Sequence, residues 1–331
     1  MPLRLLLCLL LFTPAVHADY SQHPLAASVL AQLRLEHGFN EAEIQSATAA
    51  LKAAVRLPQL IETEQKAPER TETWTQYARR IDAARIEGGV RLLSEQRDHL
   101  ARAEEEFGVP PAVIAAVLGI ETRYGRVTGN IRVLDALATQ GFDHPSRGDY
   151  FRSELVAFLA FCRDSGRDPQ TLTGSYAGAM GAAQFMPSNY SRLALDYDGD
   201  GKRDLWQLPD AIGSIGHYFI HYRPQLAWKR GEPLILPARL KQPLPANVPR
   251  NTRAPTHRID ALRRLGVKGI EELPDDLMVG LIELPLDDGS HEIWLGLHNF
   301  YAVMTYNPRV FYGMAVARLA QEIERALVAA P

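Results

Sequence analysis

One glutamate of this sequence lies where a charged side chain is unexpected. Pro111 can begin a helix, because its missing N–H costs nothing there, and Gly125 can end one, so we expect a helix over residues 111–124. Glu121 continues the apolar stripe of that helix. The other members of the stripe are Ile114, Val117 and Leu118. The pattern therefore places a carboxyl group on a face that packs inward.

The chemistry of a buried carboxyl group suggests a function for Glu121. Loss of water disfavours the charged form, so burial raises the pKa of such a group and keeps it protonated near neutral pH. A carboxyl group that gives up and retakes a proton is what cleavage of a glycosidic bond requires of its general acid. The alternative is that Glu121 ends the helix at the surface and pairs with Arg123 or Arg126. Periodicity alone does not decide between these interpretations.

A second segment, Gly174-Ser-Tyr-Ala-Gly-Ala-Met-Gly-Ala-Ala-Gln-Phe-Met-Pro187, is rich in small residues. Its glycines remove side chains where the backbone must approach a neighbour or a sugar ring closely. Ser175 and Gln184 can supply short-range hydrogen bonds, and we expect both to face a cleft. A compatible alternative is a Gly/Ala-rich helix packed tightly in the core. Ser175 does not stand in the order of a nucleophile elbow, so serine hydrolysis is not indicated.

An acidic loop follows, with carboxylates at positions 1, 3 and 5, a glycine at position 6 and an available backbone carbonyl at position 7. These residues are Asp196, Asp198, Asp200, Gly201 and Lys202. The pattern is that of an EF-hand-like loop, and its hard oxygen ligands favour calcium in a structural role. Gln207 replaces the glutamate expected at position 12, and an Asx-rich turn without metal is the alternative. His217 and His221 stand four apart, but Tyr218 breaks the metalloprotease pattern, so zinc is not expected.

Two motifs together carry a resemblance to a known family. Gly119-Ile-Glu-Thr-Arg-Tyr-Gly125, followed by the small-residue segment 174–187, resembles the membrane-bound lytic transglycosylase B family, and the similarity runs from about Trp74 to Met314. In that family the glutamate of the first motif is the only catalytic acid/base, and it corresponds to Glu121. The fold we expect is mainly α (α+β), with a lysozyme-like helical core, a helical subdomain and a small antiparallel β module.

The resemblance also implies roles for other residues. Ser175 would orient Glu121 or the substrate's acetamido group, and Gln184 would contact the sugar. Asp210 would close the calcium loop, three residues after Gln207. The aromatic and amide positions that match the family near the scissile bond are Tyr77, Tyr306 and Asn307, with Tyr218 and Tyr312 as weaker candidates. For each tyrosine, core packing is an equal alternative on sequence alone. The family has two adjacent arginines where this chain has Ser146-Arg147, so one contact to the stem peptide is lost.

The mechanism that the resemblance implies uses one carboxyl group, whereas ordinary glycosidases use two. Glu121 would protonate the oxygen between N-acetylmuramic acid and N-acetylglucosamine. As a carboxylate it would then take the proton of the muramyl 6-hydroxyl, which closes a 1,6-anhydro ring without water. Two alternatives stay open: a muramidase with a second carboxylate and water, and a non-catalytic, calcium-stabilised cell-wall binding protein.

The elements that must position these residues follow from periodicity and from breaks in it. We expect helices over residues 24–105, continued to about Tyr222 with interrupting loops. Prolines between residues 232 and 250 exclude a long helix there. Residues 277–284 and 291–297 read as a β-hairpin, and a helix follows over 315–328. The expected domains are a signal peptide (1–18), a helical subdomain (19–100), a catalytic core (101–228 with 298–331) and a small β module (229–297).

The composition is that of a soluble globular protein, with 331 residues, 46% of them hydrophobic and 23% charged. Met1–Arg4, the apolar run Leu5–Phe12 and Val16-His17-Ala18 are typical of a signal peptide cut near Asp19, so we expect a periplasmic protein. Cys8 lies inside the apolar run, so no lipid anchor is expected, and Cys162 alone remains in the mature chain.

The partner that the resemblance implies is the glycan strand of peptidoglycan. The net charge of −3 gives no reason to expect nucleic acid. Calcium is the expected ion, and no organic cofactor is expected. We expect a monomer, and the sequence does not identify cell-wall synthase or divisome partners.

Overall fold

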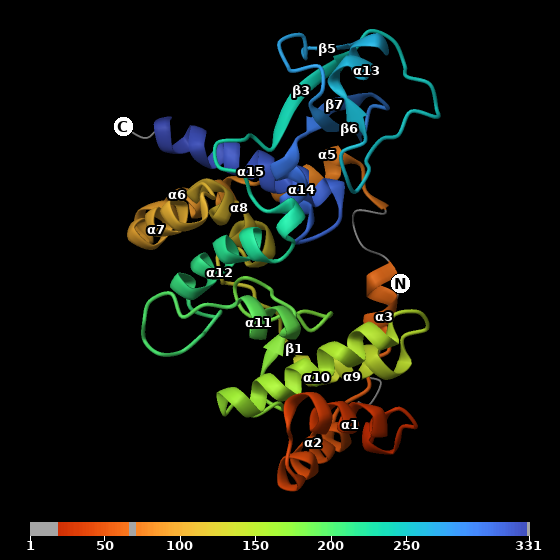
Figure 1. Ribbon diagram of the computed structural model, residues 1–331, viewed down its shortest axis with the longest axis vertical. Coiled ribbons are helices and arrows are strands. Elements are labelled where there is room, and N and C mark those ends of the chain that lie inside the picture. The colour runs from red at the N-terminus through yellow and green to blue at the C-terminus, as the bar shows by residue number, and fades with distance from the viewer. Residues whose placement is uncertain (1–18, 66–70, 330–331) are drawn as a thin grey trace, which may run out of the picture. The chain divides into compact units, whose positions relative to one another are not determined.

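The fold is described from a computed structural model, which describes residues 19–65 and 71–329 (Figure 1). The predicted signal peptide, residues 1–18, lies outside the described residues. The chain divides into two compact units. Unit 1 comprises the residues up to Glu62, Ile131–Leu172 and Tyr176–Gly178, and unit 2 comprises Thr63–Asn130, Thr173–Ser175 and the chain from Ala179 onward. The expected functional division at residues 100, 228 and 297 stays a prediction.

Unit 1 is helical. Its elements are η1 (Tyr20–Gln22), α1 (Ala26–His37), α2 (Glu41–Ala53), the first part of α3 (Gln59–Gln65), β1 (Ile131–Arg132), α9 (Val133–Asp143) and α10 (Gly148–Ser165). Asn40 begins α2 with a capping box, because its side chain accepts from the Glu43 N–H at 3.0 Å and Glu43 returns the bond to the Asn40 N–H at 2.8 Å. The buried Asp135 is paired with Arg132 at 2.7 Å, so its charge is compensated.

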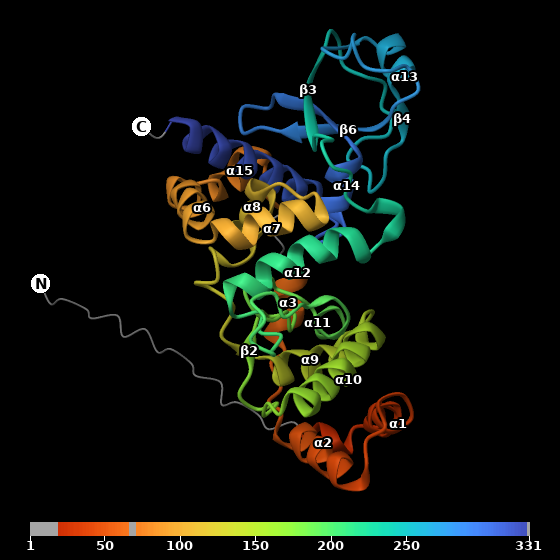
Figure 2. The same cartoon turned by 60° about the vertical axis from the view of Figure 1, so that its left-hand side comes forward.

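Unit 2 holds the remaining helices. They are α5 (Trp74–Tyr77), η2 (Ala78–Arg80), α6 (Ala83–Glu95), α7 (Arg97–Phe107), α8 (Pro111–Thr122), α11 (Pro187–Leu193), α12 (Leu208–His221), η3 (Pro224–Leu226), α14 (His298–Met304) and α15 (Val310–Ala329), with β2 at Thr173–Gly174. Helices α6, α7 and α15 pack around α8 (Figure 2). Every residue from Ala112 to Gly119 is buried, so α8 is apolar on all sides and forms the centre of this unit.

Helix α8 is two residues shorter than the sequence predicts. It ends at Thr122, because Arg123 and Tyr124 both adopt left-handed backbone conformations, with φ of 50° and 63°. Non-glycine residues rarely adopt this conformation, and two in succession are costly unless the surroundings hold them. The chain therefore turns sharply directly after Glu121.

The β module, also in unit 2, is a five-stranded antiparallel sheet in the order β4-β6-β7-β3-β5. The strands and the helix that covers them are β3 (Ile235–Leu240), β4 (His257–Arg258), α13 (Ile259–Arg264), β5 (Val267–Lys268), β6 (Met278–Pro285) and β7 (His291–Gly296). The register from Gly280↔Gly296 to Pro285↔His291 confirms the predicted hairpin. The mainly helical fold with a small antiparallel module is likewise as predicted.

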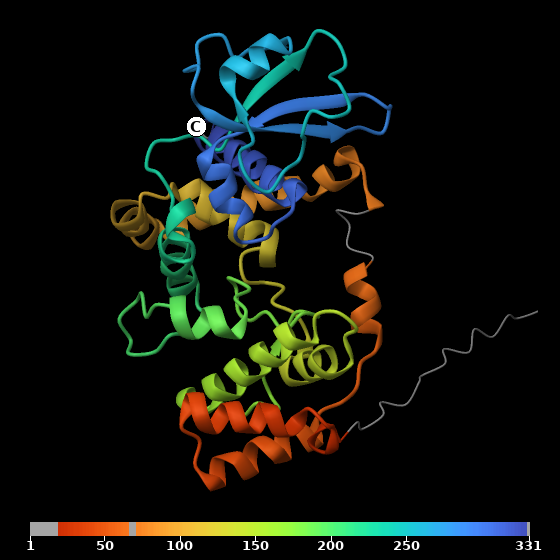
Figure 3. The same ribbon diagram turned by 45° about the vertical axis from the view of Figure 1, so that its right-hand side comes forward.

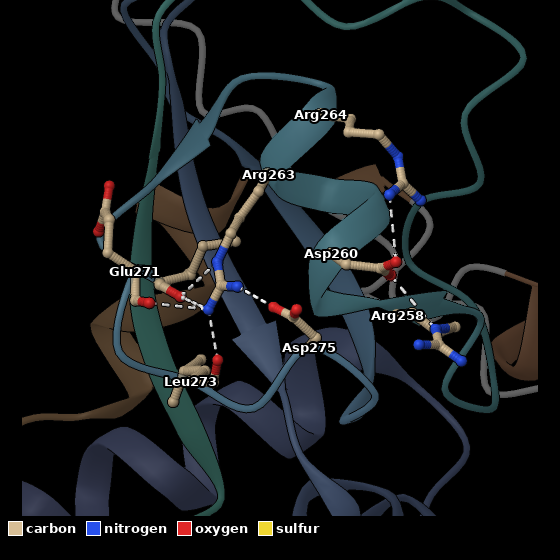
Figure 4. Close-up of polar contacts among 8 residues, drawn as sticks. Arg258, Asp260, Arg263, Arg264, Glu271, Leu273 and Asp275 are labelled. Carbon is tan, nitrogen blue, oxygen red and sulfur yellow. Dashed lines mark hydrogen bonds and ion pairs between the residues drawn. The ribbon is translucent and has the colours of Figure 1, made fainter.

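One arginine fixes the irregular loop beside α13. Arg263 donates to the carbonyl oxygens of Ile270, Glu271 and Leu273, at 3.0 Å and 2.8 Å for the first two, and pairs with Asp275 (Figure 4). A guanidinium group has five N–H donors, so it can satisfy several carbonyls of a loop at once. The loop that precedes β6 is thus held by one side chain.

Candidate active site

Glu121 lies in the last turn of α8, two residues after the buried stretch Ala112–Gly119, and is itself partly exposed. The hydroxyl of Tyr312, on α15, donates to its Oε1 at 2.7 Å. Tyr312 is only 2% exposed, so this hydrogen bond to a carboxylate is made away from bulk water, where it is strong. Arg123 is one of the two arginines considered as partners of Glu121 from the sequence, and its Nη2 lies 3.8 Å from Oδ2 of Asp82. The carboxyl group therefore combines an apolar surrounding with access to solvent.

Two tyrosines keep their protons beside this carboxyl group. Burial first, and then the negative charge of Glu121, raises the pKa of both Tyr306 and Tyr312 well above the ordinary tyrosine value. Their hydroxyl groups thus remain hydrogen-bond donors. Tyr306 donates to the carbonyl of Ala183 and packs against Tyr218, with ring centroids 4.7 Å apart. Tyr312, a weaker candidate in the sequence, is the one in direct contact with Glu121.

Tyr77 belongs to the apolar surroundings of the site. It is buried and packs on Phe311 at 5.5 Å between ring centroids and on Trp74 at 6.2 Å. The charge of Tyr77 is also among the causes that raise the pKa of Tyr312, after burial and Glu121. Tyr77 therefore lies near the Glu121–Tyr312 pair, as part of the hydrophobic core.

The small-residue segment is not a helix, so the Gly/Ala-rich helix considered from the sequence is wrong. It folds back on itself through a bridge between Met180 and Phe185. Gly178 and Gly181 have positive φ, a conformation that glycine adopts at little cost. A Cβ on Gly181 would lie 2.7 Å from the carbonyl oxygen of Leu205, so no other residue fits there without a shift.

Ser175 and Gln184 hold this loop together. The Ser175 hydroxyl accepts from the N–H of Ala179 at 3.1 Å. The Gln184 side-chain amide donates to the carbonyls of Thr128 and Gly181 at 3.0 and 2.9 Å. Asn307, the remaining predicted contact, is partly buried and directly follows Tyr306. These residues and Glu121 all belong to unit 2, and whether they contact substrate stays a prediction.

The turn that follows α8 depends on Tyr124, a residue that was not predicted from the sequence. Its hydroxyl donates to the carbonyl of Arg85, and its ring lies against three glycines. A Cβ would approach the Tyr124 side chain to 2.5 Å from Gly88, 3.0 Å from Gly89 and 2.7 Å from Gly119. Only glycines leave room for this ring. The Gly-Gly pair on α6 and the glycine on α8 were the signal that could have revealed it.

The acidic loop brings three of its predicted ligands together. One carboxylate oxygen each of Asp196, Asp198 and Asp210 lies within 4.8 Å of the others. Asp210 is buried and accepts from the N–H groups of Tyr197 and Asp204, both at 2.6 Å. Burial raises the pKa of Asp210, although these backbone bonds oppose the shift.

One predicted carboxylate ligand, Asp200, lies outside that group. Asp200 accepts from the Lys202 N–H at 2.8 Å. Gly199 and Gly201 have φ of 79° and 85°, so the backbone curls as such a loop requires. Three hard oxygen ligands on a curled loop fit a calcium ion.

The comparisons with known proteins agree with this geometry. Residues 21–321 match the model of the family described as the transglycosylase SLT domain. The membrane-bound lytic murein transglycosylase B of Escherichia coli (strain K12) is 35% identical over 317 residues, which are 94% of this chain and 85% of that protein.

Two solved structures are similar in sequence and fold. One is the catenated lytic transglycosylase SltB1 of Pseudomonas aeruginosa, with a TM-score of 0.84, 39% identity and coverage of 93% of this chain and 100% of that one. The other is the E. coli lytic transglycosylase Slt35 in complex with calcium, with a TM-score of 0.83, 34% identity and coverage of 95% and 97%.

The lysozyme-like helical fold and these relatives identify a lytic transglycosylase, an enzyme of the lyase type. The chain belongs to the lytic murein transglycosylase B family. The predicted family, fold class and enzyme class are thereby confirmed. Within the described residues, the structure contains no helix that combines the length and apolarity needed to span a membrane.

Proposed function

We propose that this enzyme cleaves the β-1,4 bond between N-acetylmuramic acid and N-acetylglucosamine in peptidoglycan and leaves 1,6-anhydromuramic acid ends. The observation that carries this proposal is the contact between Glu121 and Tyr312. It places one carboxyl group in an apolar, solvent-reachable position with a hydroxyl donor on Oε1 at 2.7 Å. The murein transglycosylase relatives support the substrate class.

In the proposed reaction Glu121 acts first as acid and then as base. The carboxyl group donates its proton to the glycosidic oxygen, and the bond between this oxygen and the anomeric carbon of N-acetylmuramic acid breaks, so the oxygen leaves with N-acetylglucosamine. The substrate's acetamido oxygen stabilises the positive charge at the anomeric carbon. The Glu121 carboxylate then takes the proton of the muramyl 6-hydroxyl, whose oxygen closes the anhydro ring. The proton that Glu121 loses is thus regained, and no water is consumed.

Tyr312 supports both states of this carboxyl group. Its buried hydroxyl donates to Oε1 and so holds the carboxyl group in place while the proton is exchanged. The proposed reaction uses this carboxyl group alone, whereas a hydrolytic muramidase would use two.

The remaining predicted residues bind or position the substrate. Ser175 and Gln184 shape the loop after β2 and present it to the sugar. Tyr306 and Asn307 lie on the segment between α14 and α15, and Tyr77 completes the apolar wall. Their side-chain bonds to backbone atoms support a role in holding the site open rather than in proton transfer.

Calcium is the proposed ion of the acidic loop, and its role is structural. Asp196, Asp198 and Asp210 supply carboxylate oxygens, with Asp200 and the carbonyl of Lys202 as further ligands. The related Slt35 structure in complex with calcium supports this choice. When bound, the ion neutralises converging carboxylates and ties the loop to the start of α12.

We further propose that residues 1–18 are a signal peptide and that the mature enzyme works as a monomer in the periplasm on glycan strands. The proposed domain division, with a catalytic core at 101–228 and 298–331, assigns Glu121, Tyr306 and Tyr312 to one module.

The test is mass spectrometry of the sugars that the mature chain releases from purified peptidoglycan. We expect muropeptides with 1,6-anhydro ends from the wild type and none from Glu121→Gln, which keeps the size of the side chain but cannot donate the proton. Reducing-end products would replace the proposal with hydrolysis. Binding to sacculi without any product would make the protein a non-catalytic cell-wall binder.

A further inference from the structure

A groove in the β module is not used by the proposed reaction. It has a volume of about 910 Å³ and lies beside β3 and β7. The two strands pair from Ile235↔Gly296 to Ala238↔Ile293 and then part, and Arg239 and Leu240 pair only with β5, which lies on the other side of β3 in the strand order. The views in Figures 2 and 3 show β3 diverging from the β6–β7 hairpin. The groove lies where β3 and β7 part, and we call this place the fork.

The fork leaves strand edges without a strand neighbour. Beyond Ile293, residues His291 and Glu292 of β7 pair with β6 alone, and residues 239–240 of β3 pair with β5 alone, within the described part of the chain. An unpaired strand edge is a template for an extended peptide, which gains main-chain hydrogen bonds from it. A sugar ring has no such backbone to offer. The shape of the fork therefore favours a short peptide.

The rim of the groove carries unbalanced positive charge. Arg239 and Lys241 are exposed, and neither takes part in an ion pair among the residues described. Glu283, which also lines the groove, is neutralised by Arg250 at 2.7 Å. Glu292 accepts from the indole N–H of Trp294 at 2.9 Å. A ligand with carboxylates would complement this rim.

Arg318 supplies a further hydrogen-bond donor in the lining of the groove. Arg318, on α15, lies over the Trp294 ring at 5.2 Å and reaches Glu292 at 3.8 Å. Its Nε is buried and has no hydrogen-bond partner among the described residues. Buried donors without a partner are rare, because the lost hydration is not replaced. A carbonyl or carboxylate of a bound peptide would satisfy this atom.

We propose that the fork between β3 and β7 binds the stem peptide of a peptidoglycan strand. The peptide lies extended along the strand edges, with its carboxylates at Arg239 and Lys241 and an acceptor at Nε of Arg318. The groove takes no part in proton transfer, so it governs how tightly peptide-bearing strands bind. This inference rests on the proposed function for the identity of the substrate, and its peptide-binding site is distinct from Glu121.

The first experiment compares two substrates: intact peptidoglycan, and glycan strands from which an amidase has removed the stem peptides. The test variant is Arg239→Glu/Lys241→Glu. Both side chains are exposed, so the fold is not at risk. The control is Lys52→Glu/Arg253→Glu, which reverses two exposed basic residues outside the groove and changes the net charge equally.

We expect the test variant to raise KM on intact peptidoglycan by about 3- to 10-fold, since exposed ion pairs contribute modestly, with kcat unchanged. KM on peptide-free strands stays at the wild-type value, and the control variant matches the wild type on both substrates. An equal rise on both substrates, or no rise on either, would overturn the proposal.

A binding measurement separates this inference from the proposed reaction. A free tetrapeptide with the stem sequence is titrated into the full mature Glu121→Gln chain, and the ¹⁵N-labelled indole signal of Trp294, assigned with Trp294→Phe, is followed. A saturating shift that Arg239→Glu/Lys241→Glu weakens supports the groove even if no cleavage is ever detected. Cleavage by the wild type with no such shift would leave the proposed function standing and reject the peptide site.

Discussion

Two regions of unit 2 contain carboxyl groups in contrasting surroundings. Glu121 accepts from the hydroxyl of Tyr312 near the end of a helix in which residues 112–119 are all buried. Asp196 and Asp210 instead accept from backbone N–H groups: Asp196 from Gly199 and Gly201 at 2.8 and 2.9 Å, and Asp210 from several donors. The same functional group is thus prepared for two different tasks.

The difference lies in the hydrogen-bond donors that each carboxyl group meets. Fixed backbone N–H groups orient the loop carboxylates and oppose the rise in pKa that burial causes at Asp210, which suits these groups to hold a cation. A carboxyl group in an apolar surrounding, with a phenol donor on one oxygen, can exist in both protonation states, which suits it to transfer a proton. Local donors, rather than residue type, therefore separate the catalytic from the structural acid.

The largest effect is expected from Glu121→Gln. The amide retains the hydrogen bond from Tyr312 but can neither donate nor retake the proton, so turnover should fall by at least about 1,000-fold. Initial rates of anhydro-product release from peptidoglycan measure this. Glu62→Gln, an exposed glutamate in unit 1, is the matched control and should leave the rate unchanged. Activity in the Glu121→Gln variant above a tenth of wild type would show that Glu121 is not the acid that transfers the proton.

Tyr312→Phe tests the donor beside the catalytic acid. Loss of a hydrogen bond to a carboxylate should reduce kcat by about 10- to 100-fold, with a smaller change in KM. Because burial and the charge of Glu121 raise the pKa of Tyr312 well above its ordinary value, the hydroxyl stays protonated as pH rises. The ratio of wild-type to variant rates should therefore be constant between about pH 6 and 9. A ratio that collapses towards one in that window would show that Tyr312 ionises and that our assignment is wrong.

Asp210→Ala tests the acid that is held by backbone donors. The substitution leaves the buried N–H groups of Tyr197 and Asp204 without their acceptor, at a cost of about 2–4 kcal/mol in the free energy of unfolding. Thermal unfolding followed by circular dichroism should show Tm lower by roughly 5–10 °C. The residual activity per folded molecule should stay close to wild type, in contrast to Glu121→Gln.

Asp200→Ala compares an exposed carboxylate of the same loop with the buried Asp210. Asp200 is exposed and lies outside the three-carboxylate group, so its loss should change stability by no more than about 0.5 kcal/mol in the absence of metal. Calcium should raise the Tm of the wild type, and chelation should remove that gain. If calcium protects Asp210→Ala as well as it protects the wild type, the ion does not bind at this loop.

Much of this site could be predicted from the sequence. The position of Glu121 follows from helical periodicity, and Asp196 and Asp198 follow from local spacing, because both patterns depend on residues close together in the chain. Periodicity also located α8, although it placed the end two residues late, since the left-handed conformations of Arg123 and Tyr124 depend on packing against α6.

Contacts between distant residues account for what sequence reasoning missed. Tyr312 lies 191 residues after Glu121, and no local pattern links the two. Tyr124 is held by Gly88 and Gly89 of another helix, and the groove lies where β3 and β7 cease to pair. Such features depend on how elements pack, which spacing along the chain does not encode.

Digestion of peptidoglycan in H₂¹⁸O shows whether one carboxyl group cleaves the glycan without water. The products are separated at once, and their masses are measured by mass spectrometry. We predict anhydro ends that contain no ¹⁸O, with all product formation lost in Glu121→Gln. Incorporation of one ¹⁸O atom at the newly formed muramyl end would mean that water attacks the anomeric carbon and that the enzyme is a hydrolase.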